Sequence, residues 1–162
     1  MTITLNHTIV PAVDNERAAA FFAGVMGLTY AGNDRHFAPV RVNEQLTLDF
    51  LTVDEPVGLH LAFDVDPVTF DQILARLRAG GMPYGSRPDE PGNGRIDHPL
   101  CPRGLYFIDD ARNLYELMSP AQGGLGGRLR LRSRRPTITV VMPTASATAL
   151  GTTSGQSAPT QP

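Results

Sequence analysis

The sequence repeats its own pattern of secondary-structure signals at a fixed spacing. His7 and His60 are 53 residues apart, and Gly27 and Gly80 are also 53 residues apart. Each His lies in an alternating segment typical of a strand, and each Gly follows an apolar stripe at helical spacing. Three further strand-like segments follow each predicted helix. A duplication of this kind predicts two βαβββ modules.

The first module is expected at residues 1–54 and begins with a strand at 3–10. Asp14 is a suitable helix N-cap, and Gly27 is a suitable left-handed residue at the helix end. Between them, apolar residues recur at i, i+3, i+4, i+7 and i+8, so we predict one amphipathic helix. The strands that follow it are predicted at 28–31, 37–42 and 45–53.

The second module is expected at residues 57–120 and begins with a strand at 57–65. Asp66 followed by Pro67 is typical of a helix start, and Gly80 marks the expected helix end. The remaining strands of this module are predicted at 83–86, 104–108 and 114–118.

These elements predict an α+β fold. Each module forms a small mixed sheet with a helix over one face, which leaves the other face without cover. Pairing the two modules makes a cup lined by both sheets, and such a cup is a natural ligand pocket. We therefore expect the two modules to build one cup, and the side chains described below predict that it is a metal-binding cup.

The residues after Pro120 differ in composition from this body. The formal charge of −2 comes from 14 basic and 16 acidic residues, and every basic residue is Arg. No Asp or Glu follows Pro120, whereas five Arg lie between Arg128 and Arg135. Because the segment is rich in Ser, Thr, Ala, Gly and Pro, we predict a mostly disordered tail at 121–162, in which 137–142 has strand-like composition. We interpret its Arg cluster as solvated, since the acidic body opposes nucleic-acid binding.

Composition also limits the compartment and the chemistry. Cys101 is the single Cys, which excludes an intramolecular disulfide and a Cys-rich zinc site. The first residues lack the features of a signal peptide, and no apolar run reaches the length of about 18 residues needed to span a membrane. We expect a cytoplasmic protein with no membrane partner.

Four residues carry the metal hypothesis. The repeat places one His on each first strand, His7 and His60, and one carboxylate on each last strand, Asp49 and Glu116. A carboxylate between apolar strand neighbours is costly unless it is paired or bound to a metal. Two imidazoles and a carboxylate suit Fe, Mn, Ni or Zn with open positions, rather than Ca. Taken singly, each residue has an ordinary structural alternative, a hydrogen-bonded core His or a solvated Glu.

Three motifs resemble those of the vicinal-oxygen-chelate superfamily, which includes glyoxalase I, extradiol dioxygenases, and fosfomycin- and bleomycin-resistance proteins. Residues 14–28 resemble its first-helix signature, an acid followed by Ala-x-x-Phe and Gly-Leu. Residues 103–109 resemble the Arg-Gly-x-Tyr-Phe-x-Asp of small members. Residues 109–117 resemble the hairpin Asp-Pro-Asp-Gly-Asn-x-x-Glu-Leu, although Asp-Ala-Arg replaces Pro-Asp-Gly. The likeness spans residues 3–120.

The resemblance implies metal ligands on the first and last strands of each module. By residue type, His7, His60 and Glu116 match these positions. Asp49 matches the fourth, where glyoxalase I uses Glu; being shorter, it is expected to reach the metal through water, to orient a ligand or to act as a base. The resemblance further implies a small-molecule substrate with two adjacent oxygens, and a homodimer in which modules pair across chains.

Four other residues have two interpretations each. His98, in the long loop at 87–103, is a candidate acid/base, but an exposed loop His is the favoured alternative. Tyr106 either donates a hydrogen bond in the cup or packs in the core. We interpret His36 as a residue of the surface or of the cup rim. Cys101 is either a reactive or an inert thiol, and we favour an inert one because no basic partner is apparent.

For function, the sequence favours metal-dependent lyase or isomerase chemistry, with Asp49 or Glu116 as the base. Extradiol-type dioxygenation, with His98 near the substrate, is the alternative; the short chain counts against it, because those enzymes more often have four modules. Metal-free sequestration of a drug or metabolite, and thiol transfer to an antibiotic, are further hypotheses. The two-His, one-Glu set counts against sequestration, and the lack of a basic phosphonate-binding cluster counts against thiol transfer.

Overall fold

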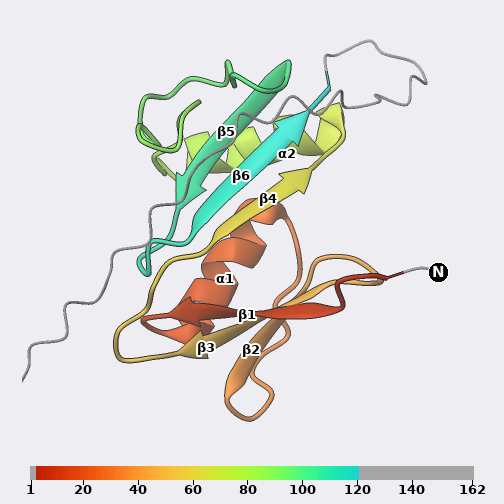
Figure 1. Cartoon of the computed structure of the whole chain (residues 1–162), viewed down its shortest axis with the longest axis vertical. Coiled ribbons are helices and arrows are strands. Elements are labelled where there is room, and N and C mark those ends of the chain that lie inside the picture. Colours follow the sequence, from red (N-terminus) through yellow and green to blue (C-terminus); the bar gives the residue numbers. More distant parts are fainter. Residues whose placement is uncertain (1–2, 121–162) are drawn as a thin grey trace, which may run out of the picture. The chain divides into compact units, whose positions relative to one another are not determined.

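The computed structural model describes residues 3–120 (Figure 1). The predicted tail at 121–162, with its Arg cluster and strand-like segment, lies outside the described residues. Neither helix in the described part of the chain has the length and apolar character that a membrane span requires. The elements follow the order β1 (His7–Ala12), α1 (Asn15–Met26), β2 (Phe37–Arg41), β3 (Thr47–Thr52), β4 (His60–Asp64), α2 (Pro67–Ala79), β5 (Arg103–Ile108) and β6 (Leu114–Ser119).

The strands form two three-stranded mixed sheets, in the orders β1-β3-β2 and β4-β6-β5. In each sheet the central strand pairs parallel with the first strand of its module and antiparallel with the other. Helix α1 covers one face of the first sheet and α2 one face of the second (Figure 1). The predicted α+β fold with two mixed sheets and two helices is confirmed, although each sheet has three strands rather than the four that the predicted βαβββ modules contain.

The register of the two sheets matches the sequence repeat. His7 begins β1, and the residue two positions later pairs with Asp49 of β3. His60 begins β4, and the residue two positions later pairs with Glu116 of β6. The two His and the two carboxylates therefore occupy equivalent positions in the two modules.

The predicted strand at 3–10 is wrong at both ends. Its partner β3 begins opposite His7, at Thr47, so β1 begins there and continues to Ala12. His7 and His60 consequently lie at the starts of their strands rather than in the middle. The strands predicted at 28–31 and 83–86 are each reduced to one isolated bridge, from Tyr30 and from Gly85.

The predicted helix boundaries are confirmed by their caps. The Asp14 carboxylate accepts the Arg17 N–H at 2.9 Å, and Gly27 ends α1 with a φ of 74°. At α2, the Asp66 carboxylate accepts the backbone N–H groups of Val68 and Thr69 at 2.9 and 3.0 Å. These bonds satisfy N–H groups that have no partner within the helix.

The two modules share one hydrophobic core, at whose centre Phe22 of α1 lies. Its ring centroid is 5.8 Å from that of Phe50 on β3, 5.9 Å from that of Phe63 on β4 and 5.0 Å from that of Tyr115 on β6. The helix-covered faces of both sheets are thus buried against α1. Because side chains alternate along a strand, the opposite faces, which carry His60 and Asp49, lie away from this core.

Candidate metal centre

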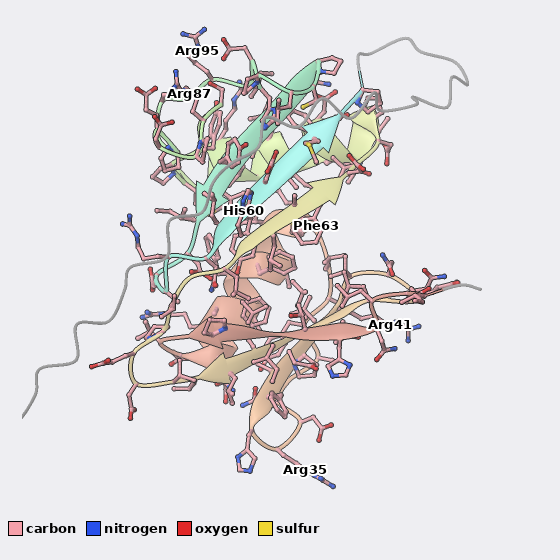
Figure 2. The ribbon with its side chains drawn as sticks, viewed as in Figure 1. Arg35, Arg41, His60, Phe63, Arg87 and Arg95 are labelled. Carbon is pink, nitrogen blue, oxygen red and sulfur yellow. The ribbon has the colours of Figure 1, made fainter. Side chains whose placement is uncertain are left out.

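His60 and Glu116 lie together on the open face of the second sheet, the face opposite the one that its helix covers. His60, labelled in Figure 2, lies at the start of β4. Its Nε2 lies 2.7 Å from Glu116 Oε2. The Glu116 side chain is 7% exposed, whereas the His60 side chain is 52% exposed. Ala62 pairs with Glu116 across the parallel strands, and its small side chain leaves room beside the carboxylate. A buried carboxylate therefore faces an accessible imidazole, an arrangement that can bind a cation from solution.

His98 reaches the same carboxylate from the loop between α2 and β5. Its side chain is fully buried, and its Nε2 lies 2.8 Å from Glu116 Oε1. The favoured interpretation of His98 as an exposed loop residue is therefore wrong. The loop folds back over β5, where the Gly104 N–H donates to the Ile96 carbonyl at 3.0 Å.

Gly104 is the sequence signal that would have indicated this burial. A Cβ at this position would lie 2.7 Å from the Cβ of His98 and 2.8 Å from its Cγ. A glycine in a buried strand often marks a close approach by another segment. From the sequence alone, the segment that approaches Gly104 could not be named.

Tyr106 hydrogen-bonds within this cluster. Its hydroxyl lies 2.8 Å from His98 Nε2, and the two rings stack with centroids 5.2 Å apart. Burial, followed by the negative charge of Glu116, raises the pKa of Tyr106 well above its ordinary value. The phenol therefore stays protonated at neutral pH and remains a hydrogen-bond donor. Tyr106 therefore forms a hydrogen bond, as one of its two interpretations requires, and its place in a ligand cup stays a prediction.

The first sheet holds the other two predicted residues. His7 is exposed, with Nδ1 2.9 Å from Asn6 Oδ1, and Asp49 is half-buried on β3. Within residues 3–120, no three His, Cys, Asp or Glu side chains are arranged to hold a metal ion. The chain thus brings together His60, His98 and Glu116, and leaves His7 and Asp49 on a different sheet.

The donor atoms on the second sheet fit two ligands of a divalent metal. His60 Nε2 and Glu116 Oε2 already converge, and imidazole with carboxylate suits first-row metals. His98 does not fit as a third ligand. Its Nδ1 accepts the Leu100 N–H at 3.0 Å, so its Nε2 carries the hydrogen and has no free lone pair.

Cys101 and His36 lie as the sequence predicts. The Cys101 thiol donates to the Arg103 carbonyl at 2.9 Å, and burial raises its pKa. Because the thiolate is the reactive form, this environment agrees with an inert residue. His36 is exposed.

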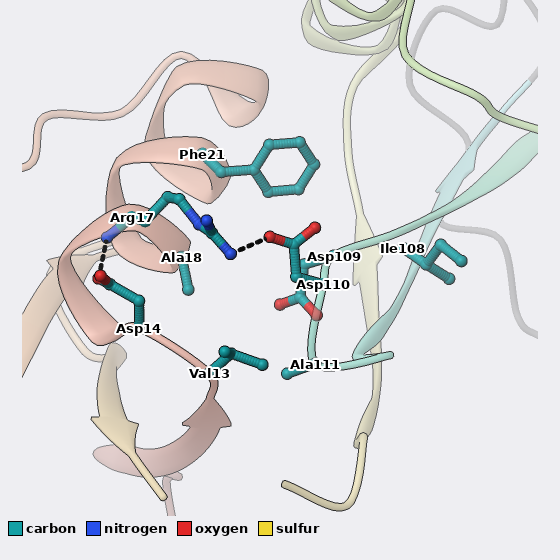
Figure 3. A pocket seen from close by; sticks show the side chains of 9 residues that line it. All are labelled: Val13, Asp14, Arg17, Ala18, Phe21, Ile108, Asp109, Asp110 and Ala111. Atoms are coloured by element: carbon teal, nitrogen blue, oxygen red, sulfur yellow. Dashed lines mark hydrogen bonds and ion pairs between the residues drawn. The ribbon is translucent and has the colours of Figure 1, made fainter. Parts of the chain in front are cut away.

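A cavity of about 200 Å³ lies elsewhere, between the start of α1 and the turn after β5 (Figure 3). Arg17 crosses it to form an exposed ion pair with Asp110. None of the predicted site residues lines it. The lining residues are Val13, Asp14, Arg17, Ala18, Phe21, Ile108, Asp109, Asp110 and Ala111.

No protein-family model and no curated protein matches the sequence. Among solved structures, oxidase ChaP-H2 is 34% identical with a TM-score of 0.68, and the match covers 78% of this chain and 100% of that chain. Oxidase ChaP-H1 is 33% identical with a TM-score of 0.67, over 76% and 100% of the two chains. A possible glyoxalase from Bacillus cereus shares the fold at 21% identity and a TM-score of 0.55, over 72% and 99%. With two three-stranded mixed sheets, each covered by its own helix, and this identity over the full length of ChaP-H2, the chain belongs to the vicinal-oxygen-chelate superfamily.

Proposed function

We propose that the protein is a metal-dependent oxidase or oxygenase that acts on a small substrate with two adjacent oxygens. The observation that carries this proposal is the His60–Glu116 pair, in which a buried carboxylate and an accessible imidazole lie 2.7 Å apart on an open sheet face. The names of the two relatives that are 33% and 34% identical support oxidation. This favours the alternative that the sequence alone ranked second, ahead of lyase or isomerase chemistry.

His60 and Glu116 would supply two of the ligands, and His7 of the partner subunit would supply the third. A two-His, one-carboxylate set with open positions is typical of Fe(II) oxygenases, so we propose Fe(II) ahead of Mn(II), Ni(II) or Zn(II). When bound, Fe(II) supplies electrons for O₂ and a positive charge that favours an anionic substrate. Glu116 would balance part of that charge, and the open face beside His60 would admit the substrate.

The open face of the first sheet supports assembly across chains. It carries His7, Asp49 and Ile9, whose side chain remains 48% exposed although it is large and apolar. The helix-covered face of the same sheet is already buried against α1. A second copy that covers this face with its own second sheet would bury Ile9 and place His7 near a His60–Glu116 pair. A two-fold symmetric dimer would contain two such sites.

A second candidate is isomerase or lyase chemistry, which the position of Asp49 supports. Asp49 occupies the repeat position equivalent to Glu116, so a cross-chain cup would hold two carboxylates on facing sheets. A carboxylate of this kind, near a metal but outside its ligand set, could remove a proton beside a carbonyl. This reaction needs no oxidant, whereas the proposed oxidation consumes O₂. Consumption of O₂ therefore separates the two candidates.

The test is to load metal-free protein separately with Fe(II), Mn(II), Ni(II) and Zn(II), and to assay catechols and methylglyoxal–thiol adducts. We expect O₂ consumption with a catechol in the Fe(II) protein and none in the Zn(II) protein. His60→Ala should abolish it, whereas His36→Ala, a change at an exposed His outside the site, should leave it unaltered. Isomerisation of the thiol adduct with Ni(II) or Zn(II), without O₂ uptake, would establish the second candidate instead. No turnover with any metal, together with tight binding of an aromatic drug, would move the protein to the sequestering class.

A further inference from the structure

We propose that His98 is a positioning residue that fixes Glu116 so that the carboxylate presents one oxygen, Oε2, to the metal. This inference rests on the proposed function, because it takes Glu116 as a metal ligand. It differs from the acid/base role for which the sequence made His98 a candidate, since the His98 ring is fully buried and both of its nitrogens have hydrogen-bonding partners.

The hydrogen bonds around His98 have a defined direction. A backbone N–H can only donate, so the bond from Leu100 makes His98 Nδ1 an acceptor and leaves the hydrogen on Nε2. Nε2–H then donates to Tyr106 Oη, 2.8 Å away, and the same nitrogen lies 2.8 Å from Glu116 Oε1. The Tyr106 hydroxyl in turn hydrogen-bonds Glu116. The chain of donors therefore runs from the loop backbone to the carboxylate.

The fold reserves space for this imidazole. Gly104 of β5 has no side chain where the His98 ring passes, and a Cβ there would overlap both the ring and the Leu117 carbonyl, 2.8 Å away. Tyr106 stacks on the other side of the ring, with an interplanar angle of 25°. Two neighbours thus set the ring plane, which fixes where Nε2–H points.

The two oxygens of Glu116 consequently have different surroundings. Oε1 faces the buried donor of His98, whereas Oε2 faces His60 on the open face. Because Oε1 lies against the fully buried His98 ring, a metal ion cannot approach it from the open face, so Glu116 would bind through Oε2 alone. Binding through one carboxylate oxygen leaves an additional coordination position on the metal open. A substrate that binds through two adjacent oxygens requires this position.

The test uses two substitutions that each keep one of the two bonds of His98. In His98→Gln, the side-chain amide can reach the position of Nε2 and donate to Tyr106 Oη beside Glu116, but the Leu100 N–H loses its acceptor. In His98→Asn, the shorter amide can accept from Leu100 but cannot reach Tyr106 or Glu116. Each variant of the full chain is titrated with Ni(II), and the melting temperature of its metal-free form is measured.

We expect His98→Gln to bind Ni(II) about as tightly as the unaltered protein, and His98→Asn to bind about 10–100-fold more weakly. Tyr106→Phe should weaken binding in the same direction. The melting temperatures should show the reverse order, with His98→Asn the more stable of the two. Equal affinities in the two His98 variants, or tighter binding by His98→Asn, would overturn the positioning role.

Two further measurements separate this inference from the proposed function. Ni(II) affinity that is unchanged in His60→Ala would overturn the metal site itself. Nitrogen-15 NMR of the metal-free protein should show His98 with its hydrogen on Nε2. A hydrogen on Nδ1 would overturn the positioning role whatever metal the protein binds, and it would be informative even if a variant failed to fold.

Discussion

Asn113 joins the two modules by hydrogen bonds. Its side chain is fully buried, its Nδ2 donates to the Pro11 carbonyl at 2.8 Å, and its Oδ1 accepts the Leu59 N–H at 2.9 Å. The Asp109 carboxylate accepts its other amide hydrogen at 2.8 Å. Because a buried polar group is costly when it lacks a partner, this one side chain stabilises two separate backbone segments and orients the Asp109 side chain.

Replacement of Asn113 by Leu should lower the free energy of unfolding by about 2–4 kcal/mol, because it leaves buried donors and acceptors unpaired. Urea denaturation measures this change. The control is Gln72→Leu on the exposed surface of α2, which should change stability by no more than about 0.5 kcal/mol. Equal losses in the two variants would contradict the role assigned to Asn113.

At the residue scale, the sequence predicted the positions of site residues where the two repeats could be compared with each other. The spacing of His7 and His60 predicted their equivalent positions, and the register confirms them. The position of His98 could not be predicted, because the loop that carries it is stabilised by contacts with β5 that leave no periodic pattern. Local propensity does not report which surface such a loop will cover.

At the element scale, the helix ends were predictable because capping chemistry is local. The weakest predictions were the strands at 28–31 and 83–86, since a short apolar run indicates burial but not strand pairing. In the structure each contributes one bridge. Two glycines, one inside α1 and one at its end, show how position, rather than residue type, decides the cost of a substitution.

Gly24→Ala and Gly27→Ala should change stability in opposite directions. Gly24 is an exposed residue inside α1, and beyond the adjacent backbone of the helix no atom lies within 4 Å of the place that an added methyl group would take, so Ala should stabilise the protein by about 0.5–1 kcal/mol. Gly27 has a φ of 74°, so Ala there should destabilise it by about 1 kcal/mol. Thermal unfolding of the two variants is the measurement, and a shift of the same sign in both would contradict the assignment of the helix end.

The cap of α2 should make stability depend on pH. Hydrogen bonds, chiefly from Thr69, hold the pKa of Asp66 below its ordinary value. A carboxyl with a lowered folded-state pKa stabilises the fold above its unfolded-state pKa, near 4, and that contribution disappears as pH falls through the folded-state value. Asp66→Asn keeps a cap without the charge. The free energy of unfolding of the unaltered protein, relative to that of Asp66→Asn, should therefore stay constant from pH 5 to 7 and fall below about pH 4. A constant difference between the two proteins down to pH 2 would contradict the prediction.

At the scale of the whole molecule, the shared core determines which sheet faces remain available. Phe22 contacts both sheets, so the helix-covered faces meet within one chain. The cup expected from the sequence needs the opposite faces, and these carry His7 and His60 on separate sheets. The sequence repeat predicted the residues that face the cup, but it could not predict which modules pair, because within-chain and cross-chain pairing bury the same apolar pattern.

Cross-chain pairing predicts that two defective variants restore each other. Light scattering should first give about twice the 17.5 kDa mass of the chain, as for a two-fold dimer. His7→Ala and His60→Ala homodimers should each lack tight metal sites. When they are mixed and allowed to exchange subunits, each heterodimer combines both changes in one site and leaves the other intact. Because half of the dimers in an equal mixture are heterodimers, and each heterodimer has one intact site of two, metal binding should recover to about a quarter of the unaltered level.

A mixture of His60→Ala and Glu116→Ala is the control and should recover nothing, since His60 and Glu116 of one site come from the same chain. Recovery in the control, or none in the first mixture, would show that the site is not built from the first sheet of one protomer and the second sheet of its partner.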